Sequence, residues 1–438
     1  MRKPEVLEHR LQVKVEALEQ LDLEAMARQT GFVLRELRKL HLNVLVKAWL
    51  GLAGDGMPTL ERMLGGMALL GHESYTKQAL SEHMRKSCSD RFFSTVLMSV
   101  LWSDAHQVIR KGRLGVSGRI WVHDSTTIAL PDRFAADFPG CVNQSRRTLS
   151  QLKLQCVFDL DKLELSQFSL SGFTRNDQAA AGDILAIAKA GDMVLRDLGY
   201  FSLAAFAAFR EESIHFLSRY RHLISLFDPL THKPLNLPKL LKRQLRLDIK
   251  VCLGSDHVPV RLVALPVPPE IVNRRRRQAY RDCRARPSKE SLFLMGWNLF
   301  ITDLSASNCP PQIIAEIYRI RWTIEIIFKA WKSCLRLDRL NTHSRGMLRF
   351  SVLTQLLLCA LTLDLCATLR HLCPPDRPPS ILRVAAILAN HSGLIACVVF
   401  QQSPAHLLNA LLIAQGSYER RRDRKNAAIR FASLFPLG

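Results

Sequence analysis

Four side chains able to take part in chemistry recur at fixed intervals late in the chain. Tyr318, Arg321, Glu325 and Lys332 form the pattern Y-x2-R-x3-E-x6-K. At about 100° per residue, an α-helix would place the last three at roughly 300°, 340° and 320° from the tyrosine. One acid, two cations and a phenol would then share a stripe about 60° wide. An acid held beside fixed cations suits a metal-assisted reaction at a phosphate.

The segment that carries this stripe, residues 316–340, is predicted to be one helix that docks through an apolar face. Arg321 and Glu325 would also fit an ordinary i,i+4 ion pair. Such a pair is worth about 0.2–0.5 kcal/mol, and the cation-first order is the weaker one. Helix geometry alone therefore leaves a catalytic stripe and a surface ion pair as equal alternatives. The apolar face consists of Ile320, Ile324, Ile327, Phe328 and Trp331.

Two aspartates at predicted strand ends supply further acids. The strand predicted at 119–124 ends in Asp124, and the strand at 193–197 ends in Asp197. If these strands are neighbours and the Glu325 helix packs across their ends, three carboxylates meet and repel one another unless divalent cations lie between them. Hard oxygen ligands suit Mg²⁺ or Mn²⁺, and two ions can activate a water and stabilise the leaving oxygen of a phosphoryl transfer. Three other acids remain competing candidates: Asp159, Asp161 and Asp177.

Five segments differ in pattern. The first, 1–104, is predicted to be helical, and its two short helices around the polar turn at 71–74 suit either a helix-turn-helix or a simple packing unit. The second alternates strands with helices, which indicates a mixed α/β sheet. The expected elements are helices at 23–52, 59–70, 75–86, 91–102, 176–190 and 203–212, and strands at 119–124, 152–159, 163–171, 193–197 and 214–218. The segments are 1–104, 105–221, 222–304, 305–345 and 346–438.

The third segment, 222–304, loses the helical rhythm and is predicted to be a β-rich insertion. Apolar and polar residues alternate with a period of two from 245 to 253. The segment also holds seven arginines within the thirteen residues 274–286, including Arg274 and Arg276. Such a run is often a solvated face, but in a chain this basic it favours contact with phosphates.

Composition narrows the class of partner. The chain has 438 residues, 48% of them hydrophobic and 23% charged, which describes a folded protein of two or three domains. Its 61 Lys and Arg residues against 39 acids leave a formal charge of +22, which implies nucleic acid or an anionic membrane surface as partner. The apolar windows 352–366 and 381–400 are interrupted by polar residues and are predicted to be buried helices, not membrane spans.

The cysteines and the start of the chain indicate a cytoplasmic protein. The eleven cysteines form no CxxC pair and no zinc-like spacing, which fits a reducing compartment. Residues 1–5 lead into charged, helix-like sequence, so no signal peptide is expected.

The acids and the spaced motif together resemble a known family. Asp124-Ser-Thr-Thr, then Asp197-Leu-Gly-Tyr-Phe, then the Tyr318-to-Lys332 pattern are similar to the DDE transposases of bacterial insertion sequences that carry a Tyr-Arg-Glu-Lys signature. The resemblance covers roughly residues 30–370. It implies a ribonuclease H-like catalytic core that is interrupted by a β-strand insertion and flanked by helical N- and C-terminal regions, the first of which binds DNA ends.

The resemblance also implies roles for individual residues. Asp124, Asp197 and Glu325 become a metal-binding triad for Mg²⁺ or Mn²⁺, with two ions expected. Tyr318, Arg321 and Lys332 become contacts to the transposon end. Trp297, in the insertion, corresponds to a tryptophan that accommodates a base flipped out of the DNA end.

The leading hypothesis is a metal-dependent transposase that hydrolyses phosphodiesters at inverted-repeat ends and joins the 3′ hydroxyls to target DNA. It is expected to act on double-stranded DNA as a homodimer in the synaptic complex, in the cytoplasm and at the nucleoid. One alternative is a catalytically silent DNA-binding protein derived from a transposase. Another is a nuclease of the same fold that lacks strand transfer.

Overall fold

The structure is a computed structural model of the 438-residue chain. It describes residues 3–34, 40–52, 59–71, 75–85, 88–102, 116, 118–142, 148–242, 244–282, 286–338, 340, 345–373 and 378–390. Most of the turn predicted at 71–74, and residues 391–438 of the predicted C-terminal region, lie outside these ranges.

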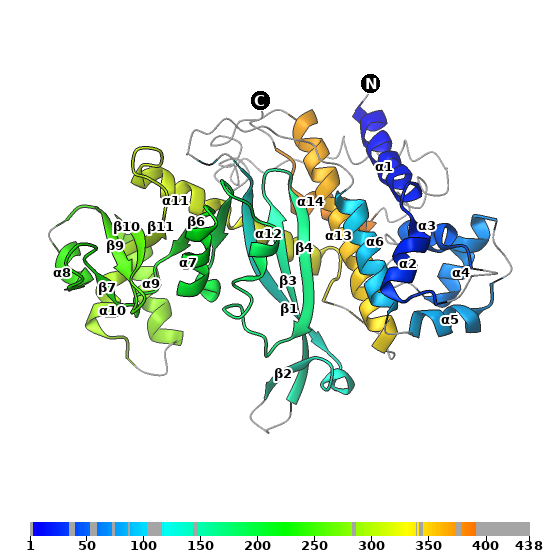
Figure 1. The fold of residues 1–438 in the computed structure, drawn as a ribbon, viewed down its shortest axis with the longest axis horizontal. Helices are drawn as coiled ribbons and strands as arrows, with labels where there is room; N and C mark the ends of the chain where they lie inside the picture. The colour runs from blue at the N-terminus through cyan, green and yellow to red at the C-terminus, as the bar shows by residue number, and fades with distance from the viewer. Residues whose placement is uncertain are drawn as a thin grey trace.

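An eleven-stranded mixed sheet forms the centre of the molecule (Figure 1). Its strand order is β2-β3-β1-β5-β6-β11-β10-β9-β7-β8, with β4 paired to β3. The predicted mixed α/β class is therefore correct. The strands are β1 (Ile120–Leu130), β2 (Pro139–Val142), β3 (Thr148–Asp159), β4 (Glu164–Gly172), β5 (Met193–Arg196), β6 (His215–Arg219), β7 (Leu226–Phe227), β8 (Pro234–Leu235), β9 (Leu247–Leu253), β10 (Val258–Pro266) and β11 (Trp297–Thr302).

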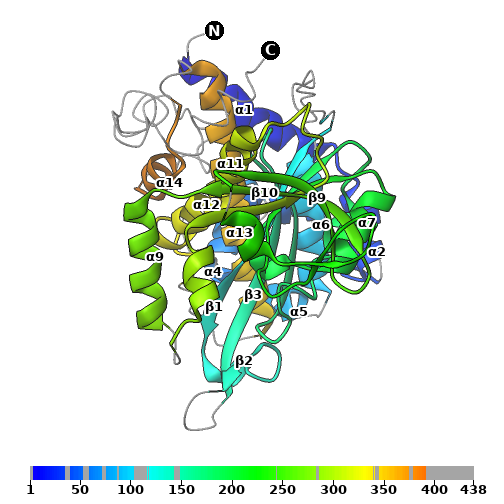
Figure 2. The same ribbon diagram turned by 90° about the vertical axis from the view of Figure 1, so that its left-hand side faces the viewer.

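The segment predicted as an insertion extends this same sheet. Its last strand, β11, pairs antiparallel with β6, so β7 to β11 continue the hydrogen-bonded ladder of the first strands. The segment is also less purely β than predicted, because three helices lie within it. The arginines of residues 274–281 lie on α9, which stands at one edge of the molecule (Figure 2). These helices are α8 (Leu237–Leu241), α9 (Pro269–Asp282) and α10 (Lys289–Leu294).

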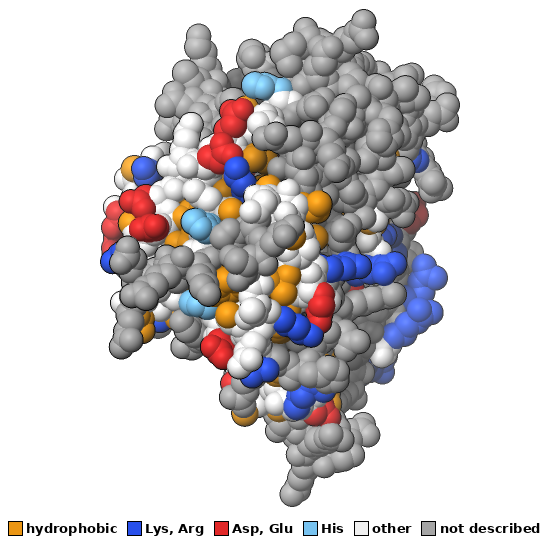
Figure 3. All heavy atoms as spheres, turned by 90° about the vertical axis from the view of Figure 1, so that its right-hand side faces the viewer, with side chains coloured by type: hydrophobic (Ala, Val, Ile, Leu, Met, Phe, Trp, Pro, Cys, Tyr) orange, Lys and Arg blue, Asp and Glu red, His pale blue; other side chains and the backbone are white. Residues whose placement is uncertain are grey.

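Helices cover the other side of the molecule. The first six gather with α13 beyond the edge of the sheet formed by β4 (Figure 1). The face that they present carries interspersed acidic and basic side chains among its described residues (Figure 3). The remaining helices are α1 (Lys3–Glu19), α2 (Leu23–Thr30), α3 (Leu42–Leu52), α4 (Leu60–Leu69), α5 (Lys77–Arg85), α6 (Ser89–Trp102), α7 (Leu203–Glu211), α11 (Pro311–Ile320), α12 (Thr323–Ser333), α13 (Arg345–Leu372) and α14 (Ile381–Asn390).

The helix α13 is the central support of this helical part. Residues 347–370 are long and apolar enough to cross a membrane, but 83% of their 18-residue apolar window is buried inside the fold. The Trp49 indole of α3 donates a 2.8 Å hydrogen bond to the hydroxyl of Thr354 on α13. It also packs edge-on against Phe93, which in turn contacts Phe350. The prediction that this apolar window is a buried helix is confirmed.

Three predicted elements differ from the structure. The helix predicted at 23–52 ends at Thr30, because Gly31 adopts a left-handed conformation with φ of +77°. The helix predicted at 176–190 is a series of turns with one short 3₁₀ helix, Asp183–Ala186. Here most of the backbone bonds are of the i→i−3 type, as from Ala180 N–H to Asp177 O, and the Asp177 side chain is bound to residues of the strands.

The segment predicted as one helix over 316–340 is two helices, α11 and α12. Between them, the N–H of Arg321 donates to Tyr318 O and that of Trp322 to Arg319 O. These i→i−3 bonds make a single tight turn. The Arg321 side chain turns inward at this break and is 5% exposed, whereas Trp322 is 54% exposed.

Candidate active site

Three carboxylates from three elements converge on the guanidinium of Arg321. Its Nη1 lies 3.3 Å from Asp124 Oδ2, and its Nη2 lies 2.7 Å from Glu325 Oε1 and 3.8 Å from Asp197 Oδ1. The Tyr318 hydroxyl donates a long, 3.4 Å hydrogen bond to the same oxygen of Asp197. The structure therefore brings together the three acids predicted as a triad, with two of their predicted companions.

The pairing of β1 with β5 explains how the two aspartates meet. These strands are parallel neighbours, with Ile120 opposite Met193 and Val122 opposite Leu195. Continued by two residues, this register sets Asp124 beside Asp197, and paired residues of adjacent strands point to the same face. Asp197 follows the last residue of β5, as predicted. Asp124 does not end its strand, because β1 continues to Leu130.

Aromatic packing positions the helix that carries Glu325. Phe158 of β3 packs against Phe328 and Trp331 of α12, with ring centroids 6.1 and 5.5 Å apart. Tyr318 of α11 packs in the same way against Phe300 of β11, at 5.2 Å. The apolar face predicted from the sequence thus holds both helices against the sheet, and the turn between them places Arg321 over the strand ends.

Burial shifts the pKa values of several groups in this cluster. It raises the pKa of Asp124 to about 6, although the Ser125 N–H and Arg321 favour the ionised form. Burial opposes the charge of Arg321, but the surrounding anionic groups outweigh it and raise its pKa. Burial also raises the pKa of Tyr318, which keeps the phenol protonated. The cluster is thus an excess of acid held around one permanent cation.

Lys332 lies beyond the triad, along β1. Its Nζ donates a 2.9 Å hydrogen bond to the carbonyl of Thr127. Burial lowers the pKa of Lys332, opposed by Asp338. The lysine lines an open groove of about 820 Å³ that begins beside Asp124 and Asp197. Lys332 is therefore near the triad but makes no direct contact with its carboxylates.

The competing acids have other hydrogen-bond partners. Asp177 lines the same groove, where its Oδ1 accepts from Ser125 Oγ, Gln155 Nε2 and Lys153 Nζ at 2.8, 3.1 and 2.8 Å. Asp159 and Asp161 lie at the turn between β3 and β4, where Asp159 Oδ1 accepts the N–H of Asp161 at 2.9 Å. Spacing alone did not exclude these three acids.

The predicted DNA contacts of the insertion lie on different surfaces. Arg274 and Arg276 are exposed on α9. Between them, Arg275 points inward and donates to the carbonyls of Met295 and Trp297. The Trp297 side chain is partly buried against the apolar core that includes Leu299 and Ile301. Strand alternation puts that core on the opposite face of the sheet from Phe300 and Tyr318.

Trp322 is a residue of this site that the sequence did not single out. It lies in the turn between α11 and α12, is 54% exposed, and its ring centroid is 5.8 Å from the Arg321 guanidinium. Its proximity to the arginine of the spaced motif was visible in the sequence. Its exposure was not, because one continuous helix was expected there.

The donor set suits a hard divalent cation in its chemistry. All three acids are oxygen ligands, and the side chains of Asp197 and Glu325 are each 41% exposed, so the cluster is open on one side. Among the described residues, no group of three His, Cys, Asp or Glu side chains is spaced to hold an ion. The guanidinium of Arg321 lies within 4 Å of all three carboxylates.

Replacing Arg321 tests its stabilising role. Arg321→Ala should lower the free energy of unfolding by about 2–3 kcal/mol at pH 8, less than a fully buried pair because two partners are partly solvated. The folded-state pKa of Asp124 already lies near 6, above its ordinary value, so its ionisation opposes folding as pH rises through 6. Without the cation this pKa rises further, so the loss should be smaller at pH 5. Urea unfolding of the parent and the variant at pH 5 and pH 8 measures this loss of unfolding free energy.

Arg319→Ala is the matched control. Arg319 pairs with Glu316 on the exposed side of α11, with 47% of its side chain exposed. Its loss should change the free energy of unfolding by less than about 1 kcal/mol at either pH. Equal effects of the two substitutions would show that Arg321 forms only an ordinary surface ion pair.

The sequence matches known transposases over most of its length. The transposase DDE domain family matches residues 117–363, more than half of the chain. The chain is 23% identical over 444 residues to the transposase for insertion sequence element IS231C of Bacillus thuringiensis subsp. berliner, covering 95% of this chain and 91% of that protein. It is also 23% identical over 290 residues to the transposase for IS1151 of Clostridium perfringens, covering 60% and 61%.

A solved transposase structure aligns more distantly. The cryo-EM structure of the piggyBac transposase synaptic complex with hairpin DNA aligns with a TM-score of 0.41 and 9% identity, over 94% of this chain and 83% of that chain. The matched family segment contains Asp124, Asp197 and Glu325. The resemblance predicted from the sequence is therefore confirmed, and the chain belongs to the DDE transposases of bacterial insertion sequences.

Proposed function

We propose that this transposase hydrolyses phosphodiesters at the inverted-repeat ends of its element and joins the freed 3′ hydroxyls to target DNA, with divalent metal ions. The observation that carries the proposal is the convergence of Asp124, Asp197 and Glu325 on one buried guanidinium. A structural ion pair needs one acid, whereas three acids from three elements are typical of a site for added positive charge.

Asp124, Asp197 and Glu325 would hold Mg²⁺ or Mn²⁺, with two ions expected. When bound, such ions activate the attacking water or hydroxyl and stabilise the leaving oxygen of an in-line phosphoryl transfer. The acids contribute the negative charge that draws the ions between them. The helix α12 fixes Glu325 through its packing on Phe158, so the third ligand does not depend on a loop.

The cationic and phenolic companions would bind the DNA end. Arg321 has a fork of donors, and its buried Nε has no hydrogen-bond partner among the described residues. This planar group suits phosphate oxygens, and Lys332 supplies a point charge further along β1. The Tyr318 hydroxyl, a proton donor at neutral pH, would orient the same phosphate beside Asp197.

The other parts of the chain complete the proposal. Residues 105–221 and 305–345 would form a ribonuclease H-like catalytic core, and 222–304 an insertion that contacts DNA. The segment 1–104 would bind the DNA ends, and the chain would act as a homodimer in the synaptic complex. The enzyme would act at the nucleoid in the cytoplasm.

Metal dependence and the triad are tested together. Purified protein should release the segment between the element's ends from a plasmid in Mg²⁺, and EDTA should abolish release. Asp124→Asn and Glu325→Gln should lower the cleavage rate at least a thousandfold, because each removes a charge at the proposed metal site. Gel assays of excision and strand transfer measure both steps.

Glu316→Gln is the control, since this acid lies on the exposed face of α11. If Asp124→Asn cuts as well as the parent, the triad assignment is wrong. Binding of ends without cutting by the parent would support the catalytically silent alternative. Cutting without joining would support a nuclease.

Base stacking at the DNA end distinguishes two tryptophans. Trp322 is exposed beside Arg321, whereas Trp297 is partly buried in the insertion. If a base extruded at the end stacks on Trp322, Trp322→Ala should weaken end binding by about 1–3 kcal/mol, and Trp322→Phe should restore most of it. Fluorescence of 2-aminopurine at the terminal positions reports the extruded base. If Trp297→Ala weakens end binding and Trp322→Ala does not, the extruded base stacks on Trp297.

The arginines of α9 are tested through salt dependence. If Arg274 and Arg276 each neutralise one DNA phosphate, the double change to Ala should make the slope of log K against log salt shallower by about 1.8. The comparison variant is Arg219→Ala combined with Arg221→Ala, which removes two arginines from β6 and the loop after it, and its salt slope is measured in the same way. An unchanged slope for the α9 variant would make this run a solvated face.

A further inference from the structure

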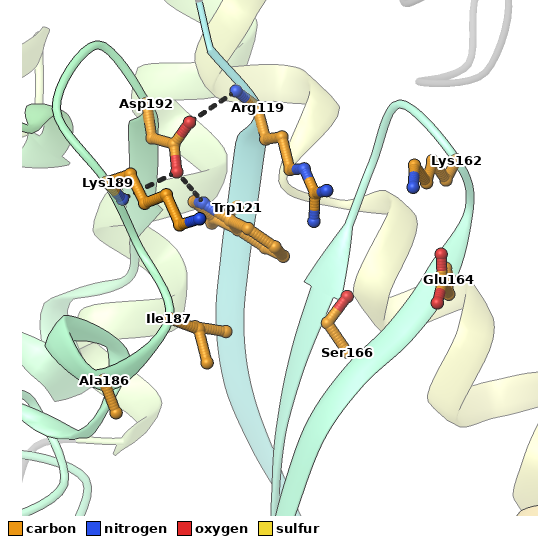
Figure 4. A pocket seen from close by; sticks show the side chains of 9 residues that line it. All are labelled: Arg119, Trp121, Lys162, Glu164, Ser166, Ala186, Ile187, Lys189 and Asp192. Atoms are coloured by element: carbon orange, nitrogen blue, oxygen red, sulfur yellow. Dashed lines mark hydrogen bonds between the residues drawn. The ribbon is translucent and has the colours of Figure 1, made fainter. Parts of the chain in front are cut away.

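A second cavity lies at the end of the sheet opposite the triad. It has a volume of about 440 Å³, and its walls are the starts of β1 and β4, the turn before β4 and the loop before β5 (Figure 4). Asp192 here and Asp197 of the triad are separated by the length of β5, roughly 16 Å at strand spacing. Trp121, in its wall, belongs to the core on the other face of the sheet from Val122. The cavity is therefore separate from the proposed active site.

Three cations from three segments line this cavity, and a buried acid holds the backbone of each. The N–H groups of Arg119 and Lys189 donate to Asp192 at 2.7 and 2.9 Å (Figure 4). The N–H of Lys162 donates to Asp159 at 3.3 Å. The backbone at all three cationic residues is therefore held by hydrogen bonds to buried carboxylates.

The surrounding geometry is constrained further. The Trp121 indole donates to Asp192 at 2.8 Å, which completes three bonds to that carboxylate. At Gly118, an added Cβ would lie 2.1 Å from Asp192 Oδ1, so the close approach requires glycine. The turn beside Lys162 contains Leu163, a buried residue with φ of +57°, a conformation that costs about 1–3 kcal/mol in a non-glycine residue.

The two buried aspartates at this cavity are bound mainly by N–H groups. Asp192 accepts three N–H bonds. Asp159 Oδ1 accepts two, whereas its buried Oδ2 has no hydrogen-bond partner among the described residues and lies 3.8 Å from Arg119 Nε. Neither Lys162 nor Lys189 makes a side-chain hydrogen bond or ion pair within the described part of the chain, and Lys162 acts on Glu164 and Asp159 only through its charge. Two ammonium groups without direct side-chain contacts and one partly engaged guanidinium therefore line the same cavity.

We propose that this cavity is a phosphate-binding site, held by Lys162, Lys189 and Arg119. Phosphate oxygens would accept charge-assisted hydrogen bonds from these cationic groups, and a cavity of about 440 Å³ has room for a phosphate with its ester group. In a transposase the phosphate is that of a DNA segment other than the scissile one. A free nucleotide or inorganic phosphate offers the same chemistry, and the experiment below separates these sources.

Glu164 makes the site sensitive to pH. It lines the cavity, and burial raises its pKa to about 7. The charged groups that act on it are Lys162 and Arg119 at the cavity, Asp159 beneath the turn and Lys14 on α1. Below pH 7 the acid is neutral and does not repel an anion, so sulfate, whose own charge is constant in this range, should bind more tightly at pH 6 than at pH 8.

The test uses full-length protein and inorganic phosphate at low ionic strength. Lys162→Gln combined with Lys189→Gln should weaken phosphate binding at least tenfold by calorimetry, because each lost charge-assisted bond alone accounts for about that factor. The charge-matched control is Lys239→Gln with Lys242→Gln, two exposed lysines at α8, which should leave phosphate binding unchanged. Equal affinity of the two double variants would overturn the proposal.

Two further measurements identify the source of the phosphate and the role of Glu164. With DNA ends, the cavity variant should make the salt slope shallower by about 0.9 if one DNA phosphate occupies the site. An unchanged slope with lost phosphate binding would support a small-anion site. Glu164→Gln should tighten sulfate binding several-fold at pH 8 and little at pH 6; equal effects would remove Glu164 from the site. Triad-dependent cleavage is measured separately, so its failure would leave this result standing.

Discussion

The guanidinium of Arg321 is the charge on which the three-carboxylate cluster depends. Asp124, Asp197 and Glu325 come from two strands and a helix, and each lies within 4 Å of this one group. Without a cation between them, burial and mutual repulsion would drive the acids apart or protonate them. Arg321 itself is nearly inaccessible to solvent. One buried cation therefore holds an arrangement that its acids alone would oppose.

That arrangement rests on two backbone features. Parallel pairing of β1 with β5 sets the aspartates side by side on one face of the sheet. The tight turn between α11 and α12 lets Arg321 reach both of them while α12 keeps Glu325 within reach. A straight helix would carry Arg321 and Glu325 along one surface, where they would form an ordinary i,i+4 pair. Because of the turn, Arg321 and Glu325 meet the two aspartates instead of lying along one helix surface.

The sheet separates two kinds of charge. At one end of the central strands, acids exceed cations around Arg321, which suits added metal ions. At the other end, N–H groups bind the buried acids, and the lysines make no direct side-chain contact with them in the described part of the chain. The two ends of neighbouring strands thus suit opposite chemistries, because three carboxylates converge at one end and three cationic residues line a cavity at the other. The arginines exposed on α9 add a third charged surface at the edge of the molecule.

Much of this protein was predictable from local pattern. Residue types and spacing singled out Asp124, Asp197 and Glu325, and period-two alternation located β9, because both signals lie within short stretches of chain. The family resemblance, which the comparisons confirm, followed from the same motifs.

Other features depended on contacts between distant segments. The turn at Arg321 and the continuation of the sheet through β11 are set by side chains and strands far away in sequence. Local sequence patterns were enough to identify the class of the protein and its three acids. Only the tertiary structure decided that Asp177 is bound elsewhere, that Trp322 is exposed and that Arg275 points inward, since burial and partner choice depend on what the rest of the chain packs against each residue.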